Sequence, residues 1–151
     1  MTEEEITHIS LAAIMHDVGK IAIPDTILNK PGRLTAEEFD IMKTHTIQGA
    51  LLLERIPQMR EFAAHHERWD GRGYPDGLKG EEISLGAQIV SLADVYDALV
   101  SRRVYKAAIP RQEALEMIRT GQCGAFNPAL LRCFFRVEEE LWRMYSKKEE
   151  A

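Results

Sequence analysis

The chain has 151 residues, 45% of them hydrophobic and 28% charged, which suffices for one domain with a core and is too short to promise two. Its formal net charge of −5 argues against a long nucleic acid as a partner, so an anionic ligand must be attracted by a local site. No apolar run reaches the ~18 residues of a membrane-spanning helix, and the acidic start MTEEEITHIS is unlike a secretory signal. We therefore expect one globular domain over residues 1–151, cytoplasmic and without membrane contact, with Cys123 and Cys133 reduced.

The N-terminal segment shows helical periodicity from about Glu3 to His16. Its apolar stripe consists of Ile6, Ile9, Ala13 and Ile14. The following residues 20–34, KIAIPDTILNKPGRL, contain two prolines and a Lys-Pro-Gly turn. This stretch predicts an irregular crossing with one short helical turn.

Two further helices are expected before the glycine-rich loop. Thr35 and Glu38 form a capping box, which predicts a helix that continues to just before Pro57. The next helix is predicted from about Gln58 to Trp69, with two adjacent histidines at its C-terminal end. The loop DGRGYPDGLKG follows directly and is too rich in glycine and proline to continue that helix.

The second half of the chain predicts a central helix and two helices after it. Ser84 is a good N-cap for LGAQIVSLADVYDALVS, which is apolar nearly all round and should be buried. Pro110 and Pro128 stand near the first turns of two more helices, and Gly121 ends the first of these. The pattern as a whole predicts an all-α fold, a single helical bundle.

Several polar residues occur where the pattern predicts a buried helix or a helix end. Alone, each histidine is more often a hydrogen-bonded core or surface residue than a metal ligand. Together they form a set that a helical bundle can gather around metal, with nitrogen and carboxylate ligands that suit iron, manganese, zinc or another first-row ion. The set is large enough to hold a pair of ions. Its members are His16, Asp17, His45, His65, His66 and Asp94.

The motifs HDVGKIAIPDTILNKPG, HHERWDGRGYPDGLKG, SLADVYDAL and RRVYK, with His45 between the first two, resemble the HD-GYP family. These are bacterial cyclic di-GMP phosphodiesterases within the HD superfamily of metal-dependent phosphohydrolases. The resemblance extends roughly from Ile6 to Phe135. It implies an HD-type helical bundle with a glycine-rich GYP loop, which hydrolyses cyclic di-GMP by attack of a metal-bound hydroxide. The end product stays open between pGpG and GMP.

The resemblance also implies roles for individual residues. The six residues of the set above would hold two divalent ions, iron or manganese before zinc, nickel or magnesium, and Asp17 would bridge them. Asp17 and Lys20 would be catalytic. The substrate would be bound by Lys20, Gly73, Tyr74, Arg103 and Lys106. Asn127 stands where the family often has aspartate, and we expect it to cap a helix.

The family's sites also draw a ligand from a helix that precedes the HD helix, the one that ends in the HD pair His16 and Asp17, and this chain begins after that position. We therefore expect an N-terminally shortened domain, an upstream sensory or receiver domain in a longer form, and an open apolar surface that a homodimer would cover. Three functions stay open. They are a cyclic di-GMP phosphodiesterase, an impaired HD-GYP module that binds or signals without turnover, and a phosphohydrolase of another nucleotide.

Overall fold

The computed structural model describes residues 1–54, 61–102 and 107–149. Within these ranges the chain forms only helices and one isolated β-bridge, between Asp70 and Lys79, so the predicted all-α fold is confirmed. None of the helices in these ranges is long and apolar enough to cross a membrane. In chain order the elements are α1 (Glu3–Met15), η1 (Val18–Ala22), α2 (Asp25–Leu28), α3 (Ala36–Lys43), α4 (His45–Leu52), η2 (Glu61–His66), η3 (Gly80–Glu82), α6 (Leu85–Val100), α7 (Arg111–Arg119) and α8 (Pro128–Glu149), where η denotes a 3₁₀-helix.

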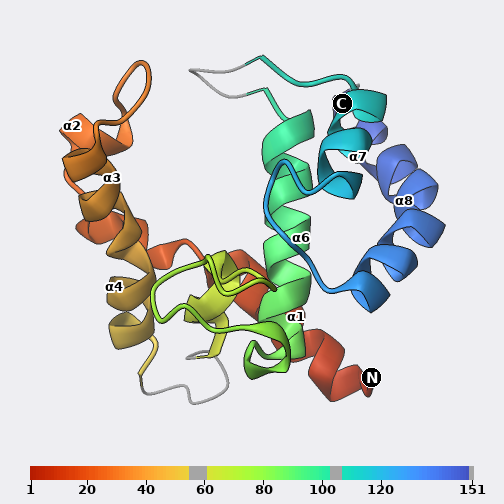
Figure 1. Cartoon of the computed structure of the whole chain (residues 1–151), viewed down its shortest axis with the longest axis horizontal. Coiled ribbons are helices and arrows are strands. Elements are labelled where there is room, and N and C mark those ends of the chain that lie inside the picture. The colour runs from red at the N-terminus through yellow and green to blue at the C-terminus, as the bar shows by residue number, and fades with distance from the viewer. Residues whose placement is uncertain (55–60, 103–106, 150–151) are drawn as a thin grey trace.

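Helix α6 is the centre of the molecule, with α2 to α4 on one side and α7 and α8 on the other (Figure 1). The Ser84 hydroxyl accepts a hydrogen bond from the Ala87 amide at 3.3 Å, which is the N-cap that the sequence predicts. Buried residues of α6, α7 and α8 form the main hydrophobic cluster, so the prediction of a buried central helix is confirmed. Helices α7 and α8 begin directly after Pro110 and at Pro128, as expected.

The prediction that Ile6, Ile9, Ala13 and Ile14 form the apolar face of α1 is wrong in part. Ile6 and Ile14 are 51% and 77% exposed, whereas Ala12 is buried and clusters with Val90 of α6 and the half-buried Ile9. Periodicity identifies residues that share a helix face, but it does not say which face a neighbour will cover. Here α1 packs against α6 through small Ala12.

The single helix predicted from Thr35 to before Pro57 is also wrong, because α3 ends at Lys43 and α4 begins at His45. The capping box at its start is confirmed, with the Thr35 hydroxyl and the Glu38 carboxylate each accepting an amide hydrogen bond of the other residue. At the break, the hydroxyls of Thr44 and Thr46 donate to the carbonyls of Ile41 and Lys43. Threonine side chains thus compete for helix carbonyls here, and His45 is the first residue of a helix and not a mid-helix residue.

The helix predicted from Gln58 to Trp69 is replaced in its described part by the short 3₁₀-helix η2, which ends at His66. From His66 on, the backbone forms hydrogen bonds with the glycine-rich loop and with Ala125 instead of continuing the helix. The Tyr74 amide donates to the His66 carbonyl at 3.3 Å, and the Trp69 amide donates to the Ala125 carbonyl at 3.0 Å. These tertiary bonds take the groups that a continuing helix would need.

Gly19, in the HDVGK motif that begins at His16, and Gly49 of α4 allow η1 to pack closely against α4. A Cβ atom on Gly19 would lie 1.9 Å from the His45 carbonyl oxygen and 2.4 Å from the Gly49 amide nitrogen, closer than any real Cβ approaches. Only glycine therefore allows η1 and α4 to meet at this distance. This contact holds Asp17, just before η1, near His45.

Candidate metal centre

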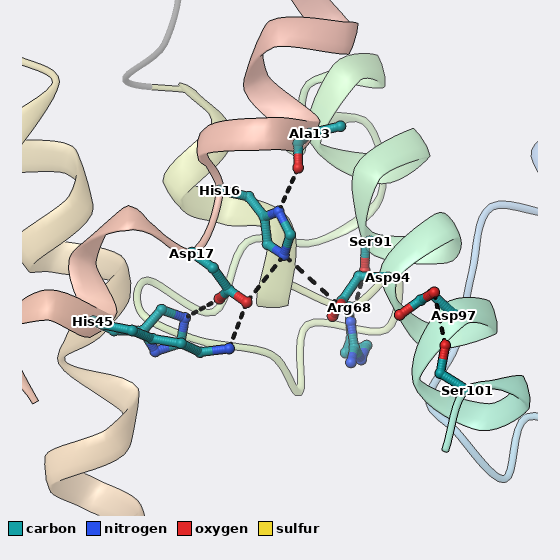
Figure 2. Close-up of polar contacts among 10 residues, drawn as sticks. Ala13, His16, Asp17, His45, Arg68, Ser91, Asp94, Asp97 and Ser101 are labelled. Atoms are coloured by element: carbon teal, nitrogen blue, oxygen red, sulfur yellow. Dashed lines mark hydrogen bonds and ion pairs between the residues drawn. The ribbon is translucent and has the colours of Figure 1, made fainter. Parts of the chain in front are cut away.

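The HD pair lies at the C-terminal end of α1. The Nδ1 atom of His16 is 2.7 Å from the Ala13 carbonyl oxygen, which can only accept, so Nδ1 carries a proton and donates. This hydrogen bond turns Nε2 inward, to 3.3 Å from Oδ2 of Asp17 and 3.7 Å from Oδ1 of Asp94 on α6 (Figure 2). His16 and Asp94, which are 78 positions apart in the sequence, thereby face one another across the bundle.

His45 repeats the same arrangement from α4. Its Nδ1 atom donates to the Met42 carbonyl at 2.7 Å, and its Nε2 atom lies 3.5 Å from Oδ1 of Asp17. The side chain is 1% exposed. An imidazole that is oriented by a backbone carbonyl at one nitrogen and presents the other to a carboxylate is arranged as metal-bound histidines usually are.

The adjacent histidines complete the cluster from η2. Their ring centroids are 4.2 Å apart, and the His66 ring is 5.1 Å from that of His45. The ring of His65 lies 4.8 Å from that of His16. Asp17, His45, His65 and His66 can each offer one ligand atom, all within 4.8 Å of one another, and His16 and Asp94 adjoin them. The structure thus brings all six predicted ligands into one place.

The atoms that meet there fit a metal. Nε2 of His16, Nε2 of His45 and Oδ1 of Asp17 are buried and have no hydrogen bond within the described ranges, although buried polar atoms are normally paired. Imidazole and carboxylate donors without thiolate suit iron, manganese and zinc. A single cation could bind to these atoms together and so satisfy all of them.

The charges of the cluster are set by burial and by each other. Burial alone would lower the pKa of His16, but the carboxylates of Asp17 and Asp94 outweigh it and raise the pKa to about 10. Burial raises the pKa of Asp17, yet His16 and Lys20 hold it far below its usual range. Burial and the neighbouring imidazoles lower the pKa of His66 to about 2, and burial likewise lowers the pKa of His45. Neutral imidazoles beside ionised carboxylates are the forms that bind metal, while His16 must lose a proton to do so.

The predicted substrate residues are only partly described. Nζ of Lys20 lies 2.5 Å from Oδ2 of Asp17, so its charge stands at the edge of the cluster. Tyr74 is half-buried and stacks on the His66 ring, with centroids 4.8 Å apart. Arg103 and Lys106 lie outside the described residues.

Gly73, expected at the substrate, has a packing role as well. A Cβ atom there would lie 2.3 Å from Cα of Glu67 and 2.4 Å from the Arg68 nitrogen. Any larger residue would therefore push the loop away from the segment that follows His66.

Glu67 is a residue that the sequence reasoning missed. Its side chain is buried, 2% exposed, and Oε1 accepts hydrogen bonds from the amides of Asp76 at 2.7 Å and Gly77 at 3.0 Å. The carboxylate thereby ties the glycine-rich loop to the residue next to His66. The available signal was a glutamate directly after the paired histidines and before a run of glycines, which need an acceptor for their amides.

Asn127 has the capping role expected of it. Its Oδ1 atom accepts from the Ala129 amide at 2.9 Å, in the first turn of α8. Its side-chain amide also donates to Oε1 of Gln88 on α6 at 2.9 Å. The residue thereby joins α6 and α8.

A bundle that gathers histidines and carboxylates from four separate elements is the architecture of a helical metal-centre domain. The model of the HD domain family matches residues 1–130, and the chain belongs to this family, in its HD-GYP branch.

Among known proteins, the chain is 46% identical to a cyclic di-GMP phosphodiesterase of Thermotoga maritima, over 99% of this chain and 42% of the relative. It is 41% identical to a 3'3'-cGAMP-specific phosphodiesterase of Vibrio cholerae, over 87% of this chain and 26% of the relative. Bd1817, an HD-GYP-type protein of Bdellovibrio bacteriovorus, shares the fold with a TM-score of 0.70 at 22% identity, over 93% of this chain and 45% of that one. The chain thus spans less than half the length of these proteins.

Proposed function

We propose that this domain is a metal-dependent phosphodiesterase that hydrolyses cyclic di-GMP, with either pGpG or GMP as the end product. The observation that carries the proposal is the cluster itself, where buried nitrogen and oxygen atoms without hydrogen bonds converge beside Lys20 and the GYP loop. The names of the relatives, cyclic di-GMP and 3'3'-cGAMP phosphodiesterases, support a cyclic dinucleotide as substrate.

The six clustered residues would hold two divalent ions, with iron or manganese favoured over zinc, nickel or magnesium. Such ions, when bound, supply an acidified water as nucleophile and neutralise charge on the phosphate. Asp17 is central because its two oxygens face different histidines, Oδ1 toward His45 and Oδ2 toward His16. This placement supports the bridging role that the family resemblance implies.

Lys20 supplies a charge of its own. Its ammonium now pairs with Oδ2 of Asp17, the same oxygen that faces His16. With a metal held by Asp17, the ammonium would be free to pair instead with a phosphate oxygen, where negative charge develops as the diester opens. Tyr74, stacked on His66, would then border the bound nucleotide. Arg103 and Lys106 stay predicted phosphate contacts.

The alternatives make different demands on the site. An impaired signalling module has no need of a full donor set, and the described residues retain all six donors. A phosphohydrolase of another nucleotide would not need the GYP loop beside the metal, where Tyr74 contacts a ligand histidine. Both observations favour the phosphodiesterase.

The test is metal content per chain together with hydrolysis of cyclic di-GMP, after purification with Mn²⁺ or anaerobically with Fe²⁺. We expect about two ions per chain, and linear product separable by chromatography. Asp17→Ala should lose metal and hydrolysis together, whereas Asp40→Ala, an exposed carboxylate paired with Lys43 on α3, should keep both. Hydrolysis and metal content unchanged in Asp17→Ala would refute the site, and a fully loaded chain that opens no cyclic dinucleotide would favour the signalling module.

We also propose a homodimer. Apolar side chains stay exposed near the site, with Ile14 77%, Ile21 82% and Leu11 45% exposed, and a second copy is the simplest cover for such a surface. Light scattering should give twice the chain mass at micromolar concentration. A stable monomer with full metal content would contradict this proposal. An upstream sensory or receiver domain and a cytoplasmic location stay predictions from the sequence.

A further inference from the structure

A cavity of about 300 Å³ opens directly beside the metal cluster. One end is formed by the ligand histidines His45 and His66 together with Lys20 and Tyr74. The other end is mostly apolar, and is formed by Ile27, Leu28, Leu34, Phe39 and Met42 with Lys30 and Gly32 beside them. The volume is at the lower end of the range for small-molecule sites, roughly 300–1,000 Å³, and the mixture of one polar end and one apolar end is typical of them.

We infer that the apolar end, here called the Phe39 cavity, is the binding site for one purine base of the dinucleotide. This inference rests on the proposed function, because it places the phosphate at the cluster. A cyclic dinucleotide carries flat bases on either side of its phosphate ring, so a base must lie next to the metals when the phosphate is bound there. The Phe39 cavity adjoins the cluster, because the predicted ligands His45 and His66 line the same cavity.

The chemistry of the walls suits a base better than a second phosphate. The cation at this end, Lys30, is already paired with Glu38, its Nζ atom 2.5 Å from Oε2. That carboxylate is in turn held by the capping box of α3, where it accepts from the Thr35 amide at 2.7 Å. Aliphatic side chains and an aromatic ring are instead the surfaces on which nucleobases stack.

Phe39 is the residue placed to make that contact. It lies on α3 three residues before Met42, so both side chains share a helix face, and both line the cavity. Its ring is 47% exposed and meets the ring of Tyr74 edge to face, with centroids 6.3 Å apart. Tyr74 stacks on His66, so a continuous line of rings runs from the ligand histidine to the Phe39 cavity.

The test separates base binding from phosphate chemistry. In Phe39→Ala, KM for cyclic di-GMP should rise about ten-fold, the usual effect of removing one base–aromatic stack, with kcat changed less than KM. Methyl 4-nitrophenyl phosphate, a diester without a base, should be hydrolysed within two-fold of the wild-type rate. Phe39→Tyr should restore KM. Ile41→Ala, an exposed apolar residue of the same helix outside the cavity, should leave both substrates unchanged.

A binding measurement keeps the inference independent of turnover. The Mn²⁺-loaded wild type should bind GMP more tightly than ribose 5-phosphate, and Phe39→Ala should abolish most of that difference. If wild type opens no cyclic dinucleotide, the proposed function fails while this comparison still tests the base site. Equal affinity for GMP and ribose 5-phosphate in the wild type would overturn the inference. An equal loss for both diesters in Phe39→Ala would also overturn it, because the ring would then act only by supporting Tyr74.

Discussion

The contact between Gly19 and Gly49 allows a prediction in which two similar substitutions have opposite effects. In Gly19→Ala the new methyl group would lie 1.9 Å from the His45 carbonyl oxygen and 2.4 Å from the Gly49 amide nitrogen. Both are backbone atoms, which cannot rotate away, so η1 and α4 must separate by roughly 1.5 Å to reach ordinary contact. Overpacking of this kind costs ~1–3 kcal/mol, and we expect the upper end of that range.

Gly49→Ala adds the same methyl group to the other side of the same contact. Its nearest atoms would be the Gly19 nitrogen at 3.4 Å and the Gly19 Cα at 3.7 Å, which is close to ordinary van der Waals contact. Gly49 lies inside α4, where alanine is favoured over glycine by ~0.5–1 kcal/mol. This variant should therefore be neutral or slightly more stable than the wild type.

The measurement is urea unfolding followed by circular dichroism, on protein stripped with a chelator so that metal affinity does not enter the free energy of unfolding. Metal content of untreated protein is the second readout, because separating η1 from α4 moves Asp17 away from His45. Gly19→Ala should lose metal, and Gly49→Ala should keep it. A Gly19→Ala variant as stable as the wild type, or a Gly49→Ala variant less stable than Gly19→Ala, would refute the reasoning.

Three other predictions concern the core, the loop and the part of the site that the structure does not describe. Arg111 hydrogen-bonds Glu138 and holds the pKa of that buried carboxyl below its ordinary 4.5, so this part of the stability is present above pH 4.5 and is lost as the pH falls below it. Glu138→Gln should weaken the acid dependence of urea unfolding, and an unchanged pH profile would contradict this. Glu67→Ala releases two loop amides and should cost about 2 kcal/mol or more while raising KM, and a change in stability alone would make Glu67 merely structural. Arg103→Ala and Lys106→Ala should weaken cyclic dinucleotide binding by calorimetry with metal content intact, and equal losses of metal would show that they do not act on phosphate.

The cluster could be predicted from the sequence because its polar residues stand in segments that are otherwise apolar. Asp94 follows Ser-Leu-Ala in the most apolar helix, and His16 with Asp17 follow Ala-Ala-Ile-Met. Burying such groups is costly unless a partner or a metal satisfies them, so the pattern indicates chemistry before any coordinate is known. The structure then places the side chains within reach of one another.

The failures have two causes, which are local hydrogen bonds from side chains to the backbone and tertiary contacts. The break at Thr44 and the 3₁₀ geometry of η2 cannot be read from periodicity, because the backbone groups involved are taken by side chains and by the loop. Glu67 was missed for the same reason, since its partners are amides nine and ten residues away. Ile14 was misplaced because helix periodicity does not show where the neighbouring helix lies.

Apart from Asp94, which lies in the middle of α6, the predicted metal ligands stand at or beside helix ends, and this explains how local sequence can set the geometry of the site. The last carbonyls of a helix lack partners within it, and the Nδ1 atoms of His16 and His45 satisfy two of these carbonyls, Ala13 at the end of α1 and Met42 at the end of α3. The same hydrogen bond therefore completes the helix terminus and points Nε2 at Asp17. At both helix ends, the hydrogen bond that satisfies the last carbonyl also orients the histidine that is predicted to bind metal. The histidines are consequently aimed at the site by contacts within three residues of themselves, and the tertiary fold has only to bring the two ends together, which the Gly19 contact does.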